Sequence, residues 1–433
     1  MAHVIPFRGV RYNPRVVSDM SDVVAPPYDR VYPDVQEACL ARHPNNIVRI
    51  IKGQATPSDN DTENVYSRAA ASLSSWLQQG VLIRDETPAI YAYHQEYTFE
   101  GQTFTRKGII ALGQLEPEKV HAHEKTLRGP KEDRLRLMQA TEANFGHIFM
   151  LYSDPARSAD RAVESAICGQ APLIQARDSD GNLHQVWSIT STETIRVVQE
   201  ALLSRELYIA DGHHRYETAV NYMRECQAKG WRPAAPESFD SRMMTLFNID
   251  EPGMTIRPIH RLVHGVSSER IRLFFDHAAA RFTVIDTSNR DEAMKVLSDH
   301  RDGHAFACFT EDRCAVLALP DGADVASVVP GTASLDYKAL DVSILHAAVL
   351  DDLLGIDAKA LEEQTHLTYT VDPADGEARV AQGTEQMLIL LNATSPEQVR
   401  GIADHGEKMP QKSTDFYPKL LTGLVLSKME IQR

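Results

Sequence analysis

Residues 62–79 carry hydrophobic side chains at helical spacing. Val65, Ala69 and Leu73 recur every four residues, so they lie on one face of a helix, with polar residues between them. Gly80 follows directly, at the position where a glycine often ends a helix. The pattern predicts an amphipathic helix that buries one side.

Two segments after this helix have the pattern of paired strands. Residues 89–99 and 102–112 are rich in β-branched and aromatic side chains, and the short turn between them holds Gly101. Strand and helix patterns then alternate along the chain, at 147–152, 155–168, 191–203, 206–210, 215–229, 243–249, 342–355 and 386–391. This alternation predicts a mixed α/β fold.

Proline-rich stretches divide the chain. The segment 231–237 ends one block of elements, which predicts an N-terminal α/β region over 1–235 and a C-terminal α/β region over 236–433. Within the second region, residues 267–320 have the order helix, strand, helix, strand, strand, and they form a candidate inserted lobe. A further proline-rich stretch, 25–29, predicts an extended and ordered loop, because proline fixes φ and removes a backbone donor.

Composition narrows the classes of protein. The 433 residues are 43% hydrophobic and 24% charged, which are the proportions of a globular protein with a sizeable core and exclude wholesale disorder or a coiled coil. The formal net charge of −15 opposes DNA and anionic membranes, so we expect no nucleic-acid or membrane partner. The N-terminus has no secretory pattern, and the five scattered cysteines fit reduced thiols. We therefore expect a cytoplasmic protein.

The most informative stretch is a strand pattern that leads into a helix at 207–223. Asp211 suits the N-cap position, and Gly212 permits a tight turn or the close approach of a ligand. The first turn of a helix favours an anion. Three basic residues add hydrogen-bond donors at the same point: His213, His214 and Arg215. The alternative is a capped helix whose basic residues lie in its first turn without binding a ligand.

A second basic stretch lies near the C-terminus. Lys412, Ser413 and Thr414 place an ammonium and two hydroxyls in a row, between Pro410 and Pro418. The stretch resembles the end of a P-loop, but the glycine-rich turn is missing, so an NTPase of that type is not predicted. On these residues alone, a solvated loop and a phosphate site are equally supported.

A third stretch combines histidines with carboxylates. If the segment is extended, His121 and His123 face the same side, which would suit a metal ion or a pair of phosphate contacts. Glu124 is a candidate general base, and Asp133 is a candidate Mg²⁺ ligand. Arg261 adds a further cation shortly after a predicted strand. The joint occurrence of these stretches in an acidic chain predicts one convergent anion site, most naturally for phosphates.

The same stretches carry a family resemblance. The chain resembles the bacterial family known as domain of unknown function 1015, over nearly its whole length. The motifs that carry the resemblance are Pro6-Phe-Arg-Gly-Val-Arg-Tyr12, Ala25-Pro-Pro-Tyr-Asp29, His123-Glu-Lys-Thr126, Ala210-Asp-Gly-His-His-Arg-Tyr-Glu-Thr218, His260-Arg261, Lys408-Met-Pro-Gln-Lys-Ser-Thr414 and Phe416-Tyr-Pro-Lys419. The Asp-Gly-His-His-Arg and Met-Pro-Gln-Lys-Ser-Thr blocks are long and specific.

The Asp-Gly-His-His-Arg block is also similar to a motif of the ParB/sulfiredoxin-like superfamily, whose members bind nucleotide phosphates at this turn. The resemblance implies a ParB/sulfiredoxin-like core with additional α/β lobes. Free-serine kinases in that superfamily carry a similar Asp-Gly-His-x-Arg and pass phosphate between a nucleotide and serine. Sulfiredoxin chemistry needs a cysteine where this chain has His213, and we find no helix-turn-helix pattern for a DNA clamp. Phosphate contacts are implied for Gly212, His213, His214 and Arg215.

These observations together predict a Mg²⁺-dependent phosphotransferase that acts between ATP or ADP and a small hydroxy amino acid, serine or phosphoserine, in either direction. Arg215 and Lys412 would neutralise the transferred group. Glu124 or Asp211 would accept the proton of the attacking hydroxyl, and Asp211 or Asp133 would hold the metal. The remaining predicted phosphate contacts are Arg261, Ser413 and Thr414.

Two other functions stay open at this point. A nucleotide-sensing regulatory protein would use the same motif without turnover. A metal-dependent hydrolase would be centred on His121, His123 and Asp133. The patterns do not fix an oligomeric state.

Overall fold

The computed structural model describes residues 3–117, 120–121 and 128–433. The chain forms two compact units: unit 1 comprises Met1–Met254 and Pro418–Arg433, and unit 2 comprises Thr255–Tyr417. This division differs from the predicted boundary after residue 235. The reason is that strand β13 (Ser241–Asn248) pairs within the sheet of unit 1, and the C-terminal segment returns to the same unit.

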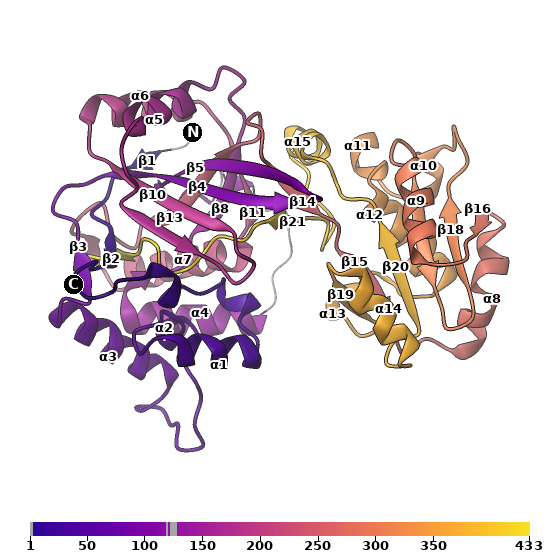
Figure 1. The fold of residues 1–433 in the computed structure, drawn as a ribbon, viewed down its shortest axis with the longest axis horizontal. Helices are drawn as coiled ribbons and strands as arrows, with labels where there is room; N and C mark the ends of the chain where they lie inside the picture. Colours follow the sequence, from indigo (N-terminus) through magenta and orange to yellow (C-terminus); the bar gives the residue numbers. More distant parts are fainter. Residues whose placement is uncertain (1–2, 118–119, 122–127) are drawn as a thin grey trace. The chain divides into compact units, whose positions relative to one another are not determined.

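Unit 1 is built around a nine-stranded mixed sheet with the order β6-β11-β8-β13-β5-β4-β10-β9, in which β1 also pairs with β5 (Figure 1). The strands are β1 (Val4–Ile5), β4 (Ile90–Phe99), β5 (Gln102–Gln114), β6 (Val120–His121), β8 (Ile148–Tyr152), β9 (Ile174–Arg177), β10 (Leu183–Ile189), β11 (Leu207–Asp211) and β13. The predicted pair of strands is confirmed as β4 and β5. Glu100 and Gly101 adopt positive φ in the turn between them.

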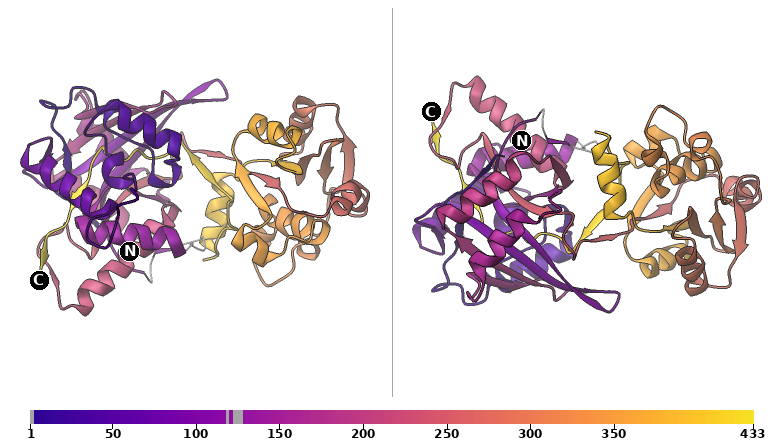
Figure 2. Two further views of the ribbon diagram at one scale, coloured as in Figure 1. Left: turned by 90° about the horizontal axis from the view of Figure 1, so that it is seen from below. Right: turned by 90° about the horizontal axis from the view of Figure 1, so that it is seen from above.

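Helices cover both faces of this sheet. Figures 1 and 2 show α5 and α6 on one face, with α4 and α7 on the opposite face. The helices are α1 (Pro33–Arg42), α2 (Val48–Ile51), α3 (Val65–Gln78), α4 (Arg128–Thr141), α5 (Ser158–Ile167), α6 (Thr192–Leu203) and α7 (His213–Ala228), with 3-10 turns η1 (Met20–Asp22) and η2 (Tyr28–Arg30). The mixed α/β prediction is confirmed.

The first predicted amphipathic helix is confirmed as α3. Asn64 accepts hydrogen bonds from the first turn in a capping box with Ser67, which explains where the helix begins. Ala69, Leu73 and Trp76 are buried on one side, as their spacing predicts.

The loop predicted over residues 25–29 is not extended throughout. Tyr28–Arg30 forms the 3-10 turn η2, in which the backbone N–H of Arg30 donates to the carbonyl of Pro27 at 2.8 Å. Pro27 precedes this turn with the fixed φ of −55°, which is compatible with the start of a helical turn.

Short strand pairs tie the C-terminal segment into unit 1. The pairs are β2 (Val10–Tyr12) with β3 (Leu82–Arg84), β7 (Ala143–Asn144) with β22 (Ser427–Lys428), and β12 (Arg232–Pro233) with β23 (Ile431–Gln432). Two of these three pairs involve the last residues of the chain, so the C-terminal segment is an integral part of this unit.

Unit 2 is a six-stranded sheet with the order β16-β18-β17-β20-β15-β19. Alternate residues of its strands face opposite helical layers. Phe306 and Cys308 pack with α8 (Ser268–Ala278) and η3 (Leu345–Leu353). Ala305 and Ala307 pack with α9 (Arg290–Asp299) and α14 (Pro373–Ala381). The strands are β15 (His260–Val263), β16 (Thr283–Asp286), β17 (Ala305–Phe309), β18 (Cys314–Ala318), β19 (Leu367–Thr370) and β20 (Met387–Leu391).

The segment 267–320 has the predicted order of elements, but its strands share one sheet with β15, β19 and β20 and do not form a separate lobe. A further pair, β14 (Thr255–Arg257) with β21 (Asp415–Tyr417), joins the two ends of unit 2. The helical elements are α8 (Ser268–Ala278), α9 (Arg290–Asp299), α10 (Val325–Val328), α11 (Leu335–Lys338), α12 (Asp341–Ile344), the π-helical η3 (Leu345–Leu353), α13 (Ala358–Glu363), α14 (Pro373–Ala381) and α15 (Pro396–Asp404).

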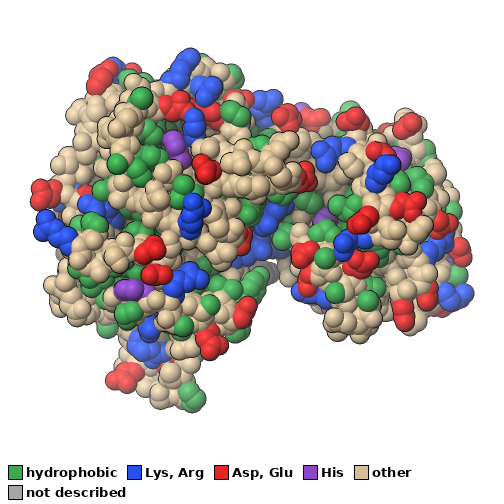
Figure 3. All heavy atoms as spheres, in the orientation of Figure 1, with side chains coloured by type: hydrophobic (Ala, Val, Ile, Leu, Met, Phe, Trp, Pro, Cys, Tyr) green, Lys and Arg blue, Asp and Glu red, His purple; other side chains and the backbone are tan. Residues whose placement is uncertain are grey.

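The surface in Figure 3 shows acidic and basic side chains interspersed over each unit on the face in view. Among the described helices, none has the length and apolar character needed to cross a membrane.

Candidate functional site

The predicted strand-to-helix turn at Gly212 is confirmed. Strand β11 ends at Asp211 and helix α7 begins at His213, with Gly212 between them at a φ of 100°. A Cβ atom on residue 212 would lie 3.0–3.1 Å from guanidinium atoms of Arg215. Both the left-handed backbone and this close contact therefore require glycine.

Asp211 is not the N-cap of α7, which corrects the sequence prediction. Gly212 occupies the cap position, and no side chain among the described residues caps the helix. Asp211 instead accepts a hydrogen bond at 3.0 Å from NH2 of Arg215, one helical turn further on. Arg215 also donates to the carbonyl of His147, so its guanidinium is fixed between two acceptors.

Four basic side chains act on the carboxylate of Asp211, which is 25% exposed. Burial raises the pKa of Asp211, but Lys419, Arg215, His213 and Arg30 outweigh burial and hold this pKa well below its usual range. Asp211 is therefore ionised at neutral pH. The turn therefore gathers basic side chains around an ionised carboxylate.

The two histidines of the motif lie in the first turn of α7. His213 is buried, with 3% of its surface exposed, and His214 is half-buried. The dipole of α7 favours an anion at this end of the helix. The motif thus combines basic side chains, a helix N-terminus and a glycine in one short turn.

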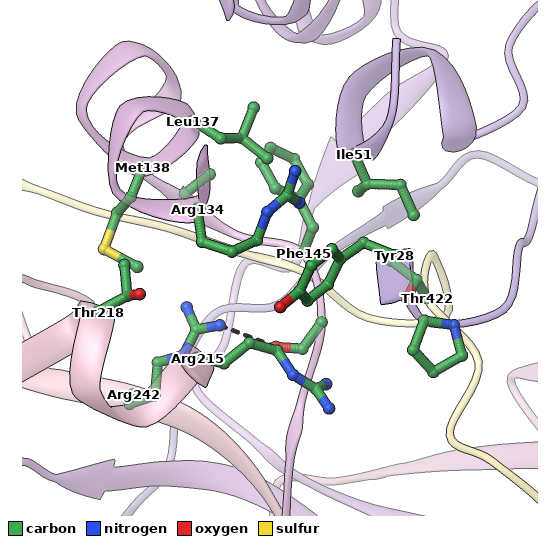
Figure 4. A pocket seen from close by; sticks show the side chains of 13 residues that line it. Tyr28, Ile51, Arg134, Leu137, Met138, Phe145, Arg215, Thr218, Arg242 and Thr422 are labelled. Atoms are coloured by element: carbon green, nitrogen blue, oxygen red, sulfur yellow. Dashed lines mark hydrogen bonds between the residues drawn. The ribbon is translucent and has the colours of Figure 1, made fainter. Parts of the chain in front are cut away.

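A pocket with a volume of about 40 Å³ opens between α4 and α7, beside the same turn (Figure 4). Three arginines line it, Arg134 from α4, Arg215 from α7 and Arg242 from β13. The hydroxyl of Tyr28 points into the pocket, and the guanidinium of Arg134 stacks on the Tyr28 ring at 4.2 Å from its centroid. Burial raises the pKa of Tyr28 to about 12, so this hydroxyl keeps its proton.

The three arginines differ in how their charge is balanced. Asp133 accepts hydrogen bonds from Arg134, and Asp211 accepts one from Arg215. Arg242 donates from NH2 to a backbone carbonyl at 3.0 Å, but its Nε and NH1 are buried and have no hydrogen-bond partner in the described part of the chain. Burial, with a further contribution from the other two arginines, lowers the pKa of Arg242 to about 9.

The C-terminal basic stretch belongs to unit 2. Arg261 on β15 is fully buried, and its NH2 donates to the carbonyl of Lys412 at 3.1 Å. Lys412 adopts a φ of 59°, and its ammonium lies 5.7 Å from the ring centroid of Tyr369. Ser413 is buried and donates to the carbonyl of Pro410 at 2.5 Å, while Thr414 is half-buried. The structure therefore brings the side chain of Arg261 to the backbone of Lys412 within unit 2.

The predicted residues thus fall into two basic clusters. Asp211, Gly212, His213, His214 and Arg215 belong to unit 1, whereas Arg261, Lys412, Ser413 and Thr414 belong to unit 2.

Much of the third predicted stretch lies outside the described residues. This applies to His123 and Glu124, and the side chain of His121 is also outside them. Asp133 on α4 accepts hydrogen bonds from Tyr66 on Oδ1 and from Arg134 on Oδ2, both at 2.9 Å. Within the described ranges, no group of three or more His, Cys, Asp or Glu side chains is arranged to hold a metal ion.

A family model with the description "Protein of unknown function (DUF1015)" matches residues 4–343 of the chain. The chain belongs to this family. No curated protein matches this DUF1015 chain.

Solved structures show distant likenesses to the DUF1015 chain. A conserved hypothetical protein from Pyrococcus furiosus is 14% identical, with 72% of this chain and 92% of that chain covered and a TM-score of 0.35. A free serine kinase in complex with AMP is 14% identical over 71% of this chain and 86% of that chain, with a TM-score of 0.36. SbnI with a C-terminal truncation, from Staphylococcus aureus, is 10% identical over 72% and 85%, with a TM-score of 0.33. At these TM-scores the likenesses establish no shared activity.

Several residues of the DUF1015 site were missed from the sequence. Arg30 directly follows the motif at 25–29, and Lys419 ends the motif that begins at Phe416, so both lay beside recognised blocks. Arg242 carried a weaker signal, as a single charged residue at the start of a strand that is buried throughout. A charge inside such a strand indicates either an ion pair or a ligand.

Proposed function

We propose that this DUF1015 protein is a Mg²⁺-dependent phosphotransferase that moves phosphate between an adenine nucleotide and a small hydroxy amino acid, with serine or phosphoserine as the substrate. The observation that carries the proposal is the set of basic side chains around Asp211 at the N-terminus of α7. Phosphoryl transfer depends mainly on positioning and on cationic stabilisation of the transferred group. This set supplies both.

The phosphates of the nucleotide bind at the turn after β11. Gly212 has no side chain to obstruct them, and the first turn of α7 presents N–H groups to them. Lys419 and Arg30 supply permanent positive charge near Asp211, and His214 supplies a further donor. The similarity of the Asp-Gly-His-His-Arg block to the ParB/sulfiredoxin-like motif supports the same placement.

Asp211 suits the metal better than it suits proton transfer. Because its pKa is held so low, its carboxylate is a weak base, whereas an ionised oxygen ligand is what Mg²⁺ prefers. Both oxygens of Asp133 are engaged by Tyr66 and Arg134, so Asp133 fits this role less well. Bound Mg²⁺ would neutralise phosphate charge, and Asp211 would hold it together with the nucleotide. Glu124 is the proton acceptor in this proposal.

The basic cluster of unit 2 is also proposed to contact phosphate. Arg261 donates a hydrogen bond to the backbone carbonyl of Lys412. Lys412 adopts a left-handed backbone conformation, which is strained for a residue other than glycine and is typical of functional sites. We assign phosphate contacts within unit 2 to Arg261, Lys412, Ser413 and Thr414.

The direct test is a ³¹P NMR screen of the purified protein with Mg²⁺, ATP or ADP, and a panel of amino acids and their phosphates. The proposal predicts phosphate exchange between the nucleotide and serine or phosphoserine. If ADP binds but no phosphate moves to or from any member of the panel, phosphotransfer is contradicted and the protein senses nucleotide without turnover. Elemental analysis of the same preparation tests the metal-dependent hydrolase, which requires stoichiometric transition metal.

A further inference from the structure

The pocket of unit 1 is lined by three arginines, and no carboxylate is among its described lining residues. Asp133 and Asp211 pair with Arg134 and Arg215, and neither carboxylate pairs with Arg242. Arg242 is buried, with 4% of the residue exposed. Among the described lining residues, its Nε and NH1 are the buried side-chain donors that lack a partner.

An unpartnered guanidinium in this position is costly. A buried donor that loses its bond to water and gains no replacement destabilises the folded protein, and a buried unpaired charge does so more strongly. Arg215 and Arg134 add repulsion, since they lie close enough to act on the ionisation of Arg242. A bound anion that accepts from one of these donors would supply a missing hydrogen bond and would offset the repulsion.

The size and the walls of the pocket define the anion. Its volume of about 40 Å³ is room for about three water molecules, at roughly 10–15 Å³ each, which suits one oxyanion group and excludes a whole nucleoside. Leu137, Met138 and Phe145 form apolar walls that exclude water and so strengthen charge interactions. Tyr28 and Thr422 add hydroxyl groups to the lining.

We propose that the pocket between α4, α7 and β13 binds one small oxyanion group, a carboxylate or a phosphate, through the guanidinium of Arg242 and the hydroxyl of Tyr28. A guanidinium N–H and a phenol hydroxyl both donate hydrogen bonds to the oxygens of such a group. This site is separate in its chemistry from the nucleotide turn, although Arg215 borders both. It does not depend on phosphoryl transfer, because a protein that only binds ligands would keep it.

Thermal unfolding measures this binding directly. Phosphate, sulfate and acetate are added to the purified full-length protein at an ionic strength held constant with sodium chloride. The wild type should gain about 2–3 °C in Tm once the effective anion reaches roughly ten times its Kd. Arms with L-serine and O-phospho-L-serine then distinguish the two sources. A carboxylate site responds to acetate and to both amino acids, whereas a phosphate site responds to phosphate and phosphoserine but not to acetate or L-serine.

Substitution of Arg242 separates a binding role from a structural one. Arg242→Met keeps the length of the side chain and removes the charge, so it should lose the anion-dependent gain in Tm while its Tm in chloride stays at or above that of the wild type. Arg177→Met is the control, because Arg177 is an exposed arginine on the edge strand β9 and should keep the full gain. An anion response that survives in Arg242→Met would overturn the proposal.

Tyr28→Phe provides a second, milder variant that removes one hydroxyl. It should raise the Kd for the same anion by roughly tenfold or more, the loss expected for a hydrogen bond to a charged group. A wild type that shows no gain in Tm with any of these anions beyond chloride also overturns the proposal. Anion binding without ³¹P exchange would contradict the phosphotransferase and leave this inference standing.

Discussion

At the scale of single residues, the pair formed by Asp211 and Arg215 organises the turn between β11 and α7. Arg215 donates to Asp211 at 3.0 Å, and its own side chain is only 7% exposed. The carboxylate is paired with one cation and influenced by three further basic groups, so it stays ionised. An ionised Asp211 is what its proposed role as a Mg²⁺ ligand requires.

Replacing Asp211 by Asn keeps the shape of the side chain and removes its charge. We expect kcat to fall by roughly 10–100-fold, because Mg²⁺ loses a ligand. We also expect ADP without Mg²⁺ to bind at least as tightly as to the wild type, because a negative charge near the phosphates is gone. Asp85→Asn is the matched control, since Asp85 pairs with Arg11 at 2.8 Å elsewhere in unit 1. Weaker metal-free ADP binding with unchanged kcat would contradict the role of Asp211.

At the scale of elements, sequence patterns correctly predicted the helices, strands and turns that local interactions determine. The helix α3, the strands β4 and β5 and the turn at Gly212 all followed from spacing, capping residues or glycine. The N-cap of α7 did not, because Asp211 could bond either to the backbone of the next turn or to Arg215. That choice depends on the carbonyl of His147, which holds Arg215 in place from 68 residues away. The 3-10 turn at η2 was missed because proline permits both an extended chain and the start of a turn.

The turn itself can be tested with a pair of alanine substitutions. Gly212→Ala forces a Cβ into the left-handed region and against the Arg215 guanidinium, whereas Gly181→Ala has the same backbone strain, at a φ of 83°, with no atom within 4 Å. We expect a loss of about 1–2 kcal/mol in the free energy of unfolding for Gly181→Ala, and at least about 1 kcal/mol more for Gly212→Ala. Urea denaturation measures both. Equal losses would show that the contact with Arg215 costs nothing.

At the scale of the whole molecule, pairing between strands that are distant in the sequence determines features that local sequence patterns do not predict. The boundary of unit 1 depends on β13 pairing with β5 and β8, and on the return of residues 418–433. The same pairing carries Arg242 to the pocket beside Arg215, although nothing in the local sequence joins them. The basic motifs were recognisable from their residue types, but their division between two units was not, because contacts distant in sequence decide it.

The pH dependence of stability follows from buried histidines. His147 donates from Nε2 to the carbonyl of Val425 at 3.1 Å, and burial lowers its pKa to about 4, while burial lowers the pKa of His346 to about 3. Their folded pKa values lie below the unfolded value of about 6.5. The stability that the neutral histidines contribute is therefore fully present above about pH 6.5. As the pH falls towards the folded pKa values, the unfolded state is protonated first and this stability is lost, by about 3 kcal/mol for His147.

Urea denaturation at pH 7 and pH 4.5 checks this expectation. His147→Gln can keep a donor to Val425 and cannot ionise, so it should lose less stability between the two pH values than the wild type. An identical loss in the variant would show that His147 does not contribute to the acid sensitivity.

Nucleotide phosphates are proposed to bind at the turn between β11 and α7. Calorimetric titration of ADP with Mg²⁺ tests this proposal in the wild type and in two lysine variants of the C-terminal segment. Lys419→Met removes a cation that acts on Asp211 and should weaken binding by about 1.5–3 kcal/mol, whereas Lys428→Met removes a cation paired with Glu142 at 3.4 Å and should leave the Kd unchanged. If Lys419→Met binds ADP as tightly as Lys428→Met does, the phosphates do not bind at this turn.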